Sequence, residues 1–127
     1  MLLVDAVLER AEKRIVCSKN FSSTDFFVQG HFPGFPLVPG VILCECCLQA
    51  GAVLVADHAQ IAAGMVPVAT RIDGAKFKKM VRPGDTVTIE VSLNEVVSNA
   101  FYLTGKVTLD GKLAARLDFA VSVAEPQ

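Results

Sequence analysis

Apolar and polar residues alternate along the last third of the chain. Three segments show this period of two, at positions 87–93, 101–109 and 113–123. Sustained alternation is typical of a β-strand that turns one face to the core and the other to solvent. The Asp110-Gly111 pair between the last two segments is typical of a tight hairpin turn. The pattern therefore predicts three consecutive antiparallel strands.

Four more strands are predicted upstream of these three. Near the N-terminus, two short runs rich in Val, Leu and Ile, at positions 2–10 and 14–20, flank the polar turn 11–13. After a loop around Gly64, positions 65–72 and 75–81 are predicted to be two strands. The sequence Arg82-Pro83-Gly84-Asp85 then predicts a turn.

The middle of the chain has two parts: a stretch interrupted by prolines, and then a long apolar stretch. Residues 22–30 predict a turn or a short helix, and prolines at positions 33, 36 and 39 exclude a helix or a central strand just after it. From Pro39 to about Gln60 the chain predicts one helix that is apolar nearly all round. Such a helix needs a sheet curved around it, which predicts an α+β fold with the helix at its centre.

Length and charge narrow the class of protein. A chain of 127 residues predicts a single domain, 1–127, and a domain of this size gains from self-association if it is to enclose an active site. A net charge of -1 argues against nucleic acid as a partner. Asp5 and Glu9 do not fit a signal peptide, and Glu45 and Gln49 interrupt the longest apolar stretch, so no membrane span is predicted.

The four cysteines, at positions 17, 44, 46 and 47, lack the spacing of zinc ligands. We expect buried thiols, no metal site and a reducing, cytoplasmic location.

One carboxylate lies in the apolar helix. Glu45 is the only residue of Asp, Glu, Lys or Arg type between Asp25 and Asp57, and His31 lies fourteen residues upstream. A buried carboxylate is costly unless it is paired or used, so the pair is a candidate acid and base. A structural histidine and a satisfied polar helix residue are the alternatives. Gln49, four residues after Glu45, shares its helix face and is predicted to orient the carboxyl group.

The segment 31–45, HFPGFPLVPGVILCE, resembles the β-hydroxyacyl-ACP dehydratases of fatty acid synthesis. The similarity extends to the first strand, to Gln29-Gly30 and to the segment 76–85. The chain departs from the family pattern at Cys46-Cys47 and at Phe35, and begins almost at its first strand, without the leader common in relatives. The resemblance implies a hotdog fold and a homodimer joined edge to edge, possibly a trimer of such dimers, with His31 and Glu45 from different subunits.

The resemblance also implies how 3-hydroxyacyl-ACP would become trans-2-enoyl-ACP. His31 suits proton abstraction beside the thioester, and Glu45 suits proton delivery to the leaving hydroxyl. The backbone N–H of Gly40, at the helix start, would stabilise the enolate oxygen. The Leu37 carbonyl would fix the His31 tautomer, which rests on the resemblance alone.

The remaining expectation concerns a local basic cluster, formed by Lys76, Lys78, Lys79 and Arg82. These residues either protect a solvated strand edge or dock an acidic acyl carrier protein, whose phosphopantetheine arm carries the substrate. No cofactor of the protein's own is expected. A hotdog thioesterase and a non-catalytic acyl-binding subunit are the alternative functions.

Overall fold

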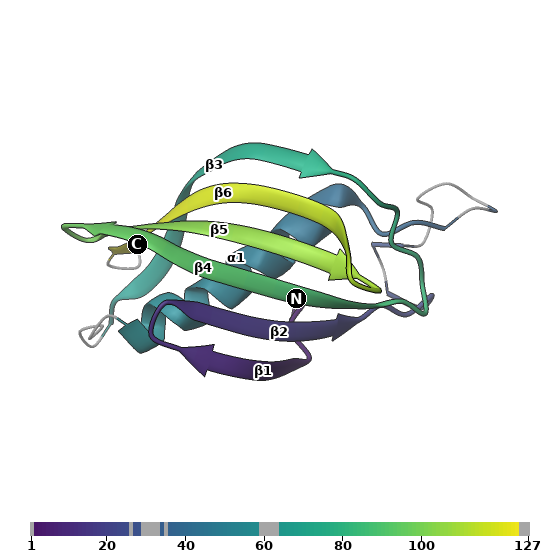
Figure 1. The fold of residues 1–127 in the computed structure, drawn as a ribbon, viewed down its shortest axis with the longest axis horizontal. Helices are drawn as coiled ribbons and strands as arrows, with labels where there is room; N and C mark the ends of the chain where they lie inside the picture. Colours follow the sequence, from purple (N-terminus) through teal and green to yellow (C-terminus); the bar gives the residue numbers. More distant parts are fainter. Residues whose placement is uncertain (1, 26, 29–33, 35, 59–63, 125–127) are drawn as a thin grey trace.

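A computed structural model describes residues 2–25, 27–28, 34, 36–58 and 64–124. They form six strands and one helix (Figure 1). In chain order these are β1 (Ala6–Ala11), β2 (Arg14–Asn20), α1 (Gly40–His58), β3 (Val66–Phe77), β4 (Thr86–Val97), β5 (Ala100–Leu109) and β6 (Lys112–Ala124).

All six strands join one antiparallel sheet in the order β1-β2-β4-β5-β6-β3. The sheet curves around α1, which lies behind it in Figure 1 and contacts every strand from β2 to β6. On β4 and β5 buried and more exposed residues alternate, because only one face of the sheet meets the helix. The predicted α+β hotdog fold is thus confirmed.

Helix α1 packs closely against the sheet at two glycines. A Cβ added to Gly51 of the helix would lie 2.7 Å from the ring of Phe119, and one added to Gly105 of β5 would lie 2.7 Å from Cys47 Cβ. Real Cβ atoms do not approach this closely, so a side chain at either position would have to displace its neighbour.

The prediction of two strands at 65–72 and 75–81 was wrong. A single strand, β3, runs from Val66 to Phe77 and pairs with β6. The register shifts between Ala69 and Arg71 and again between Asp73 and Lys76, where Gly74 has φ +59°. The Asp73-Gly74 pair therefore makes a bulge and not the predicted break, and four strands follow the helix where five were predicted.

The other boundaries agree more closely. The helix was predicted over Pro39 to Gln60 and is observed over Gly40–His58, and Gln60 lies outside the described residues. Strand β2 matches its prediction, whereas β1 begins only at Ala6. The turn at 82–85 is confirmed by a 3.0 Å hydrogen bond from the Asp85 N–H to the Arg82 carbonyl, with Gly84 at φ +96°.

By length and composition alone, α1 could cross a membrane, since residues Gly40–Asp57 have a mean hydropathy of 1.7. Its packing against five strands of the sheet is that of a core helix. All four cysteines are buried free thiols, as predicted.

Candidate active site

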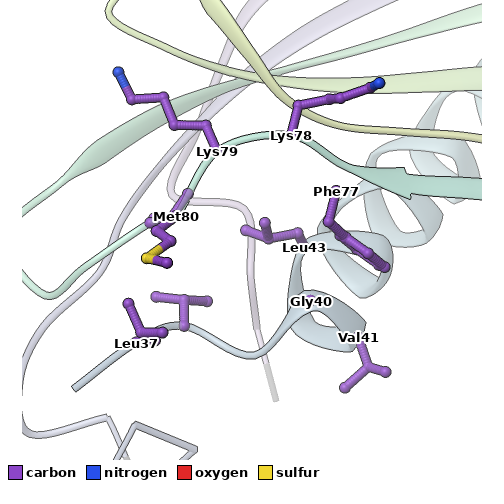
Figure 2. A pocket seen from close by; sticks show the side chains of 10 residues that line it. Leu37, Gly40, Val41, Leu43, Phe77, Lys78, Lys79 and Met80 are labelled. Carbon is purple, nitrogen blue, oxygen red and sulfur yellow. The ribbon is translucent and has the colours of Figure 1, made fainter. Parts of the chain in front are cut away.

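The first turn of α1 opens onto an apolar cavity of about 510 Å³ (Figure 2). We call it the Gly40 cavity; its lining includes Leu37, Gly40, Leu43, Phe77 and Met80. The Val38 N–H donates to the Val81 carbonyl at 2.8 Å and so ties the segment before the helix to the chain that follows β3.

The ring of Phe77 packs against Gly40. A Cβ at Gly40 would lie 2.8 Å from Phe77 Cε1, so any other residue here would displace the ring. Phe77 remains 52% exposed in the single chain. The N–H groups of this first turn have no acceptor within the helix, and the Phe77 ring occupies the space beside Gly40 that a side chain would fill.

Two of the predicted basic residues border this cavity. Lys78 and Lys79 line it, and Figure 2 shows their ammonium groups directed away from its apolar interior. Their backbone N–H groups both donate to the Ala114 carbonyl, at 2.7 Å and 3.3 Å. Lys76 and Arg82 are exposed but do not line this cavity, so only two of the four predicted basic residues border it.

Glu45 lines a different cavity, of about 200 Å³, which we call the Glu45 cavity. Gln49 and Ala52 of α1 line it together with Pro67 and Ala69 of β3. Gln49 Nε2 donates to Glu45 Oε1 in a long hydrogen bond of 3.4 Å, so the two side chains meet as their spacing predicts. Gln49 Oε1 accepts a second bond, of 2.7 Å, from the Leu3 backbone N–H.

The single chain therefore divides the predicted site residues between two cavities. Leu37 and Gly40 lie in the first, and Glu45 and Gln49 lie in the second. Glu45 is rotated about 140° from Gly40 around the helix axis, which turns the two residues to different sides. His31 lies outside the described residues, so its predicted pairing with Glu45 stays a prediction.

The cysteines beside Glu45 are not nucleophiles. Burial raises the pKa of the Cys46 thiol to about 12, and it also raises the pKa values of Cys44 and Cys47. These thiols stay protonated at neutral pH. Within the described part of the chain, no three His, Cys, Asp or Glu side chains are grouped so that they could hold a metal ion.

Sequence reasoning missed the contact of Leu3 with Gln49. Leu3 was assigned only to a strand, and no local pattern connects it to a side chain 46 residues away. Sequence reasoning also did not predict that Phe77 packs against Gly40, since strand prediction does not say which helix residue the end of a strand contacts.

Comparison with known proteins identifies relatives over nearly the whole chain. Residues 1–118 match the family model described as a FabA-like domain. The 3-hydroxyacyl-[acyl-carrier-protein] dehydratase FabZ of Oenococcus oeni is 41% identical over 93% of this chain and 85% of its own length. The enzyme of the same name from Thermomicrobium roseum is 40% identical over 99% of this chain and 85% of its own length.

Solved structures show the same fold at low sequence identity. The smu.793 protein of Streptococcus mutans, bound to acetyl CoA, superposes with a TM-score of 0.75 at 13% identity over 96% of this chain and 90% of its own. The dehydratase heterocomplex ApeI:P from Xenorhabdus doucetiae superposes with a TM-score of 0.73 at 21% identity over 96% and 98%. With the match over 1–118, the chain belongs to the FabA-like family and groups there with the FabZ 3-hydroxyacyl-[acyl-carrier-protein] dehydratases.

Proposed function

We propose that this protein is a 3-hydroxyacyl-ACP dehydratase of fatty acid synthesis, which eliminates water from 3-hydroxyacyl-ACP to give trans-2-enoyl-ACP. Membership of the FabA-like family and about 40% identity to FabZ dehydratases support the reaction. The observation that carries the mechanism is the division of the site residues between two cavities of one chain. We infer that two copies of the chain complete each site.

The positions of the two cavities along β3 support such a shared site. Phe77, at one end of β3, borders the Gly40 cavity, and Pro67, near the other end, borders the Glu45 cavity. These residues are about 33 Å apart along an extended strand. β3 is an edge strand of the sheet. Antiparallel pairing of two β3 strands about their midpoint would bring the Gly40 cavity of one copy beside the Glu45 cavity of the other.

The proposed reaction needs a base and an acid on opposite sides of the substrate. His31 takes the proton from the carbon next to the thioester carbonyl, and the resulting charge on the thioester oxygen is stabilised by the Gly40 N–H. Glu45 of the partner subunit gives its proton to the hydroxyl group, the C–O bond breaks and water leaves. The Leu37 carbonyl would hold His31 in the tautomer that can accept the proton.

The surroundings of the Gly40 cavity suit an acyl thioester. Its walls are largely apolar, as an acyl chain requires, and Lys78 and Lys79 border it. An acidic acyl carrier protein would dock on these residues together with Lys76 and Arg82, and insert its phosphopantetheine arm. The arm belongs to the substrate, so the proposed chemistry uses no cofactor or metal of the protein's own. We place the enzyme in the cytoplasm, with its carrier protein.

One assay separates this function from its alternatives. Purified protein is incubated with crotonyl and 3-hydroxybutyryl thioesters, and both the enoyl absorbance and the free thiol are followed. A dehydratase interconverts the two thioesters reversibly and releases no thiol. Release of thiol would identify a thioesterase, and binding without turnover would identify an acyl-binding subunit; either outcome contradicts the proposal.

The catalytic pair is tested by substitution. His31→Ala and Glu45→Gln are each expected to lower kcat by about 10²–10⁴-fold, which is the typical contribution of a positioned acid or base. Sedimentation should show an unchanged dimer in both variants. As a sharper test, mixing the two inactive variants should restore part of the activity, because a mixed dimer contains one site with both native residues. A variant that retains activity would refute the role of that residue.

A further inference from the structure

We propose that the N-terminal segment, residues 3–5, positions the acid of the reaction, because the Leu3 backbone N–H sets the orientation of the Gln49 side chain that contacts Glu45. The inference rests on the proposed function and adds a positioning role for a segment outside both cavities.

The contact with Leu3 decides which way the Gln49 amide faces. The Leu3 backbone nitrogen can only donate, so the Gln49 atom 2.7 Å from it must be the oxygen. The NH2 group of Gln49 then faces Glu45, where Nε2 lies 3.4 Å from Oε1. With the amide reversed, the Gln49 NH2 group would face the Leu3 N–H, which is also a donor. The NH2 group would then no longer face its acceptor on Glu45. The bond from the Leu3 N–H therefore favours the amide orientation in which Gln49 donates to Glu45.

The segment that carries this N–H is itself held firmly on β2. The Leu3 side chain is 1% exposed and belongs to the hydrophobic core. Two residues on, the Asp5 N–H donates to the Ser18 carbonyl at 2.8 Å, and Asp5 Oδ2 accepts a 2.6 Å bond from the Asn20 N–H. Asp5 Oδ1 also lies 3.3 Å from the Nζ of Lys19, whose side chain is mostly buried. These bonds leave the Leu3 N–H little freedom to move away from Gln49.

The orientation of Gln49 distinguishes the two oxygens of Glu45. Oε1 faces a donor, so it is the acceptor oxygen, and Oε2 is the oxygen that carries the proton. In the reaction, the Oε2–H bond breaks as the substrate hydroxyl takes the proton, and the C–O bond breaks as water departs. The negative charge left on the carboxylate is then partly stabilised at Oε1 by the Gln49 NH2. Loss of the Leu3 bond would weaken this orientation of Gln49 and, with it, the stabilisation of the carboxylate.

The test removes one N–H group from the segment. Leu3→Pro deletes the donor, whereas Leu2→Pro places the same residue one position upstream, at an exposed side chain, and keeps the Leu3 N–H. With crotonyl-CoA as the probe, Leu3→Pro should lower kcat about tenfold with little change in KM, as for loss of one hydrogen bond to a charged group. Leu2→Pro should keep the unmodified kcat. Leu3→Val keeps the N–H and measures what altered packing of this side chain costs, so Leu3→Pro must fall clearly below it.

The decisive measurement is the same substitution in a second background. If the Leu3 N–H acts through Gln49, Leu3→Pro should cause no further loss of kcat in the Gln49→Met variant. Should Leu3→Pro fail to fold, Asp5→Ala replaces it in both backgrounds, since this substitution removes the side-chain contacts of the segment with Lys19 and Asn20 of β2. Equal losses of kcat in the two backgrounds would overturn the inference while leaving the dehydratase function intact. So would a kcat of Leu3→Pro no lower than those of Leu2→Pro and Leu3→Val. An unmodified protein without turnover would instead overturn the proposed function and this inference with it.

Discussion

Glu45 and Cys46 are neighbours on α1 but have opposite surroundings. Glu45 is partly exposed and lines a cavity, whereas Cys46 is fully buried. One step along a helix rotates the side chain by about 100°, which is enough to turn it from a cavity into the core. At the residue scale, this rotation separates a carboxyl group that lines a cavity from a thiol whose pKa burial raises to about 12.

The raised thiol pKa predicts how stability depends on pH. A thiol in the unfolded chain ionises with an ordinary pKa of 9.0, whereas folded Cys46 holds its proton up to a pKa of about 12, so between these values the unfolded state binds fewer protons. The contribution of Cys46 is present below pH 9 and declines above it by about 1 kcal/mol per pH unit. Urea unfolding of the native protein and of Cys46→Ala at about pH 8 and about pH 10 should show a smaller decline in the variant. Parallel declines would contradict a buried, protonated thiol.

At the scale of elements, the helix and the sheet are fitted to each other by residues that lack a side chain. Gly51 of α1 accommodates the Phe119 ring, and Gly105 of β5 accommodates Cys47. The two contacts set how closely the helix approaches the sheet.

Gly105→Ala tests this fit. The new Cβ would lie 2.7 Å from Cys47 Cβ and 3.3 Å from Leu117 Cδ2, and the Cβ of Cys47 cannot rotate away. The free energy of unfolding should fall by about 1–3 kcal/mol, as for other overpacked cores. Lys106→Ala, at an exposed neighbouring position, should change it by less than about 0.5 kcal/mol. Equal unfolding midpoints for the two variants in urea would show that the helix has room to shift.

At the scale of the whole molecule, β3 is an edge strand that no other described strand covers. Val66, Val68 and Ile72 on this strand are exposed, and so is Val41 at the start of α1. Exposed apolar residues along one sheet edge are typical of a surface that another chain covers. Pairing of two such edges would cover them and would also assemble the proposed shared site.

Ile72→Arg should therefore dissociate the dimer and remove activity together. Ile72 lies near the midpoint of β3, where pairing would bury the new guanidinium in an apolar contact. We expect a monomer by sedimentation and a kcat at least about 10²-fold lower, since neither site would contain both His31 and Glu45. Leu8→Arg, at a comparably exposed position on the opposite edge strand β1, is the matched control and should remain dimeric. A fully active monomer would contradict the shared site, and an intact dimer would contradict pairing at β3.

Local patterns in the sequence determined most of the fold. Alternation predicted β4, β5 and β6, the apolar run after Pro39 predicted α1, and the turn residues at 82–85 and 110–111 predicted their turns. These features depend on residues close together in the chain, so their period and turn chemistry can be read directly from it. The family motif between His31 and Glu45 likewise indicated the reaction, because it is a contiguous run of residues.

Only the tertiary structure decided how distant segments meet. Pairing with β6 makes β3 one bulged strand where two were predicted, because a strand partner can absorb an irregularity that looks like a break in the sequence. The same packing separates Gly40 from Glu45 into two cavities and brings the Leu3 N–H to Gln49 across 46 residues. Such contacts depend on the relative positions of folded elements, which no periodicity along the chain encodes.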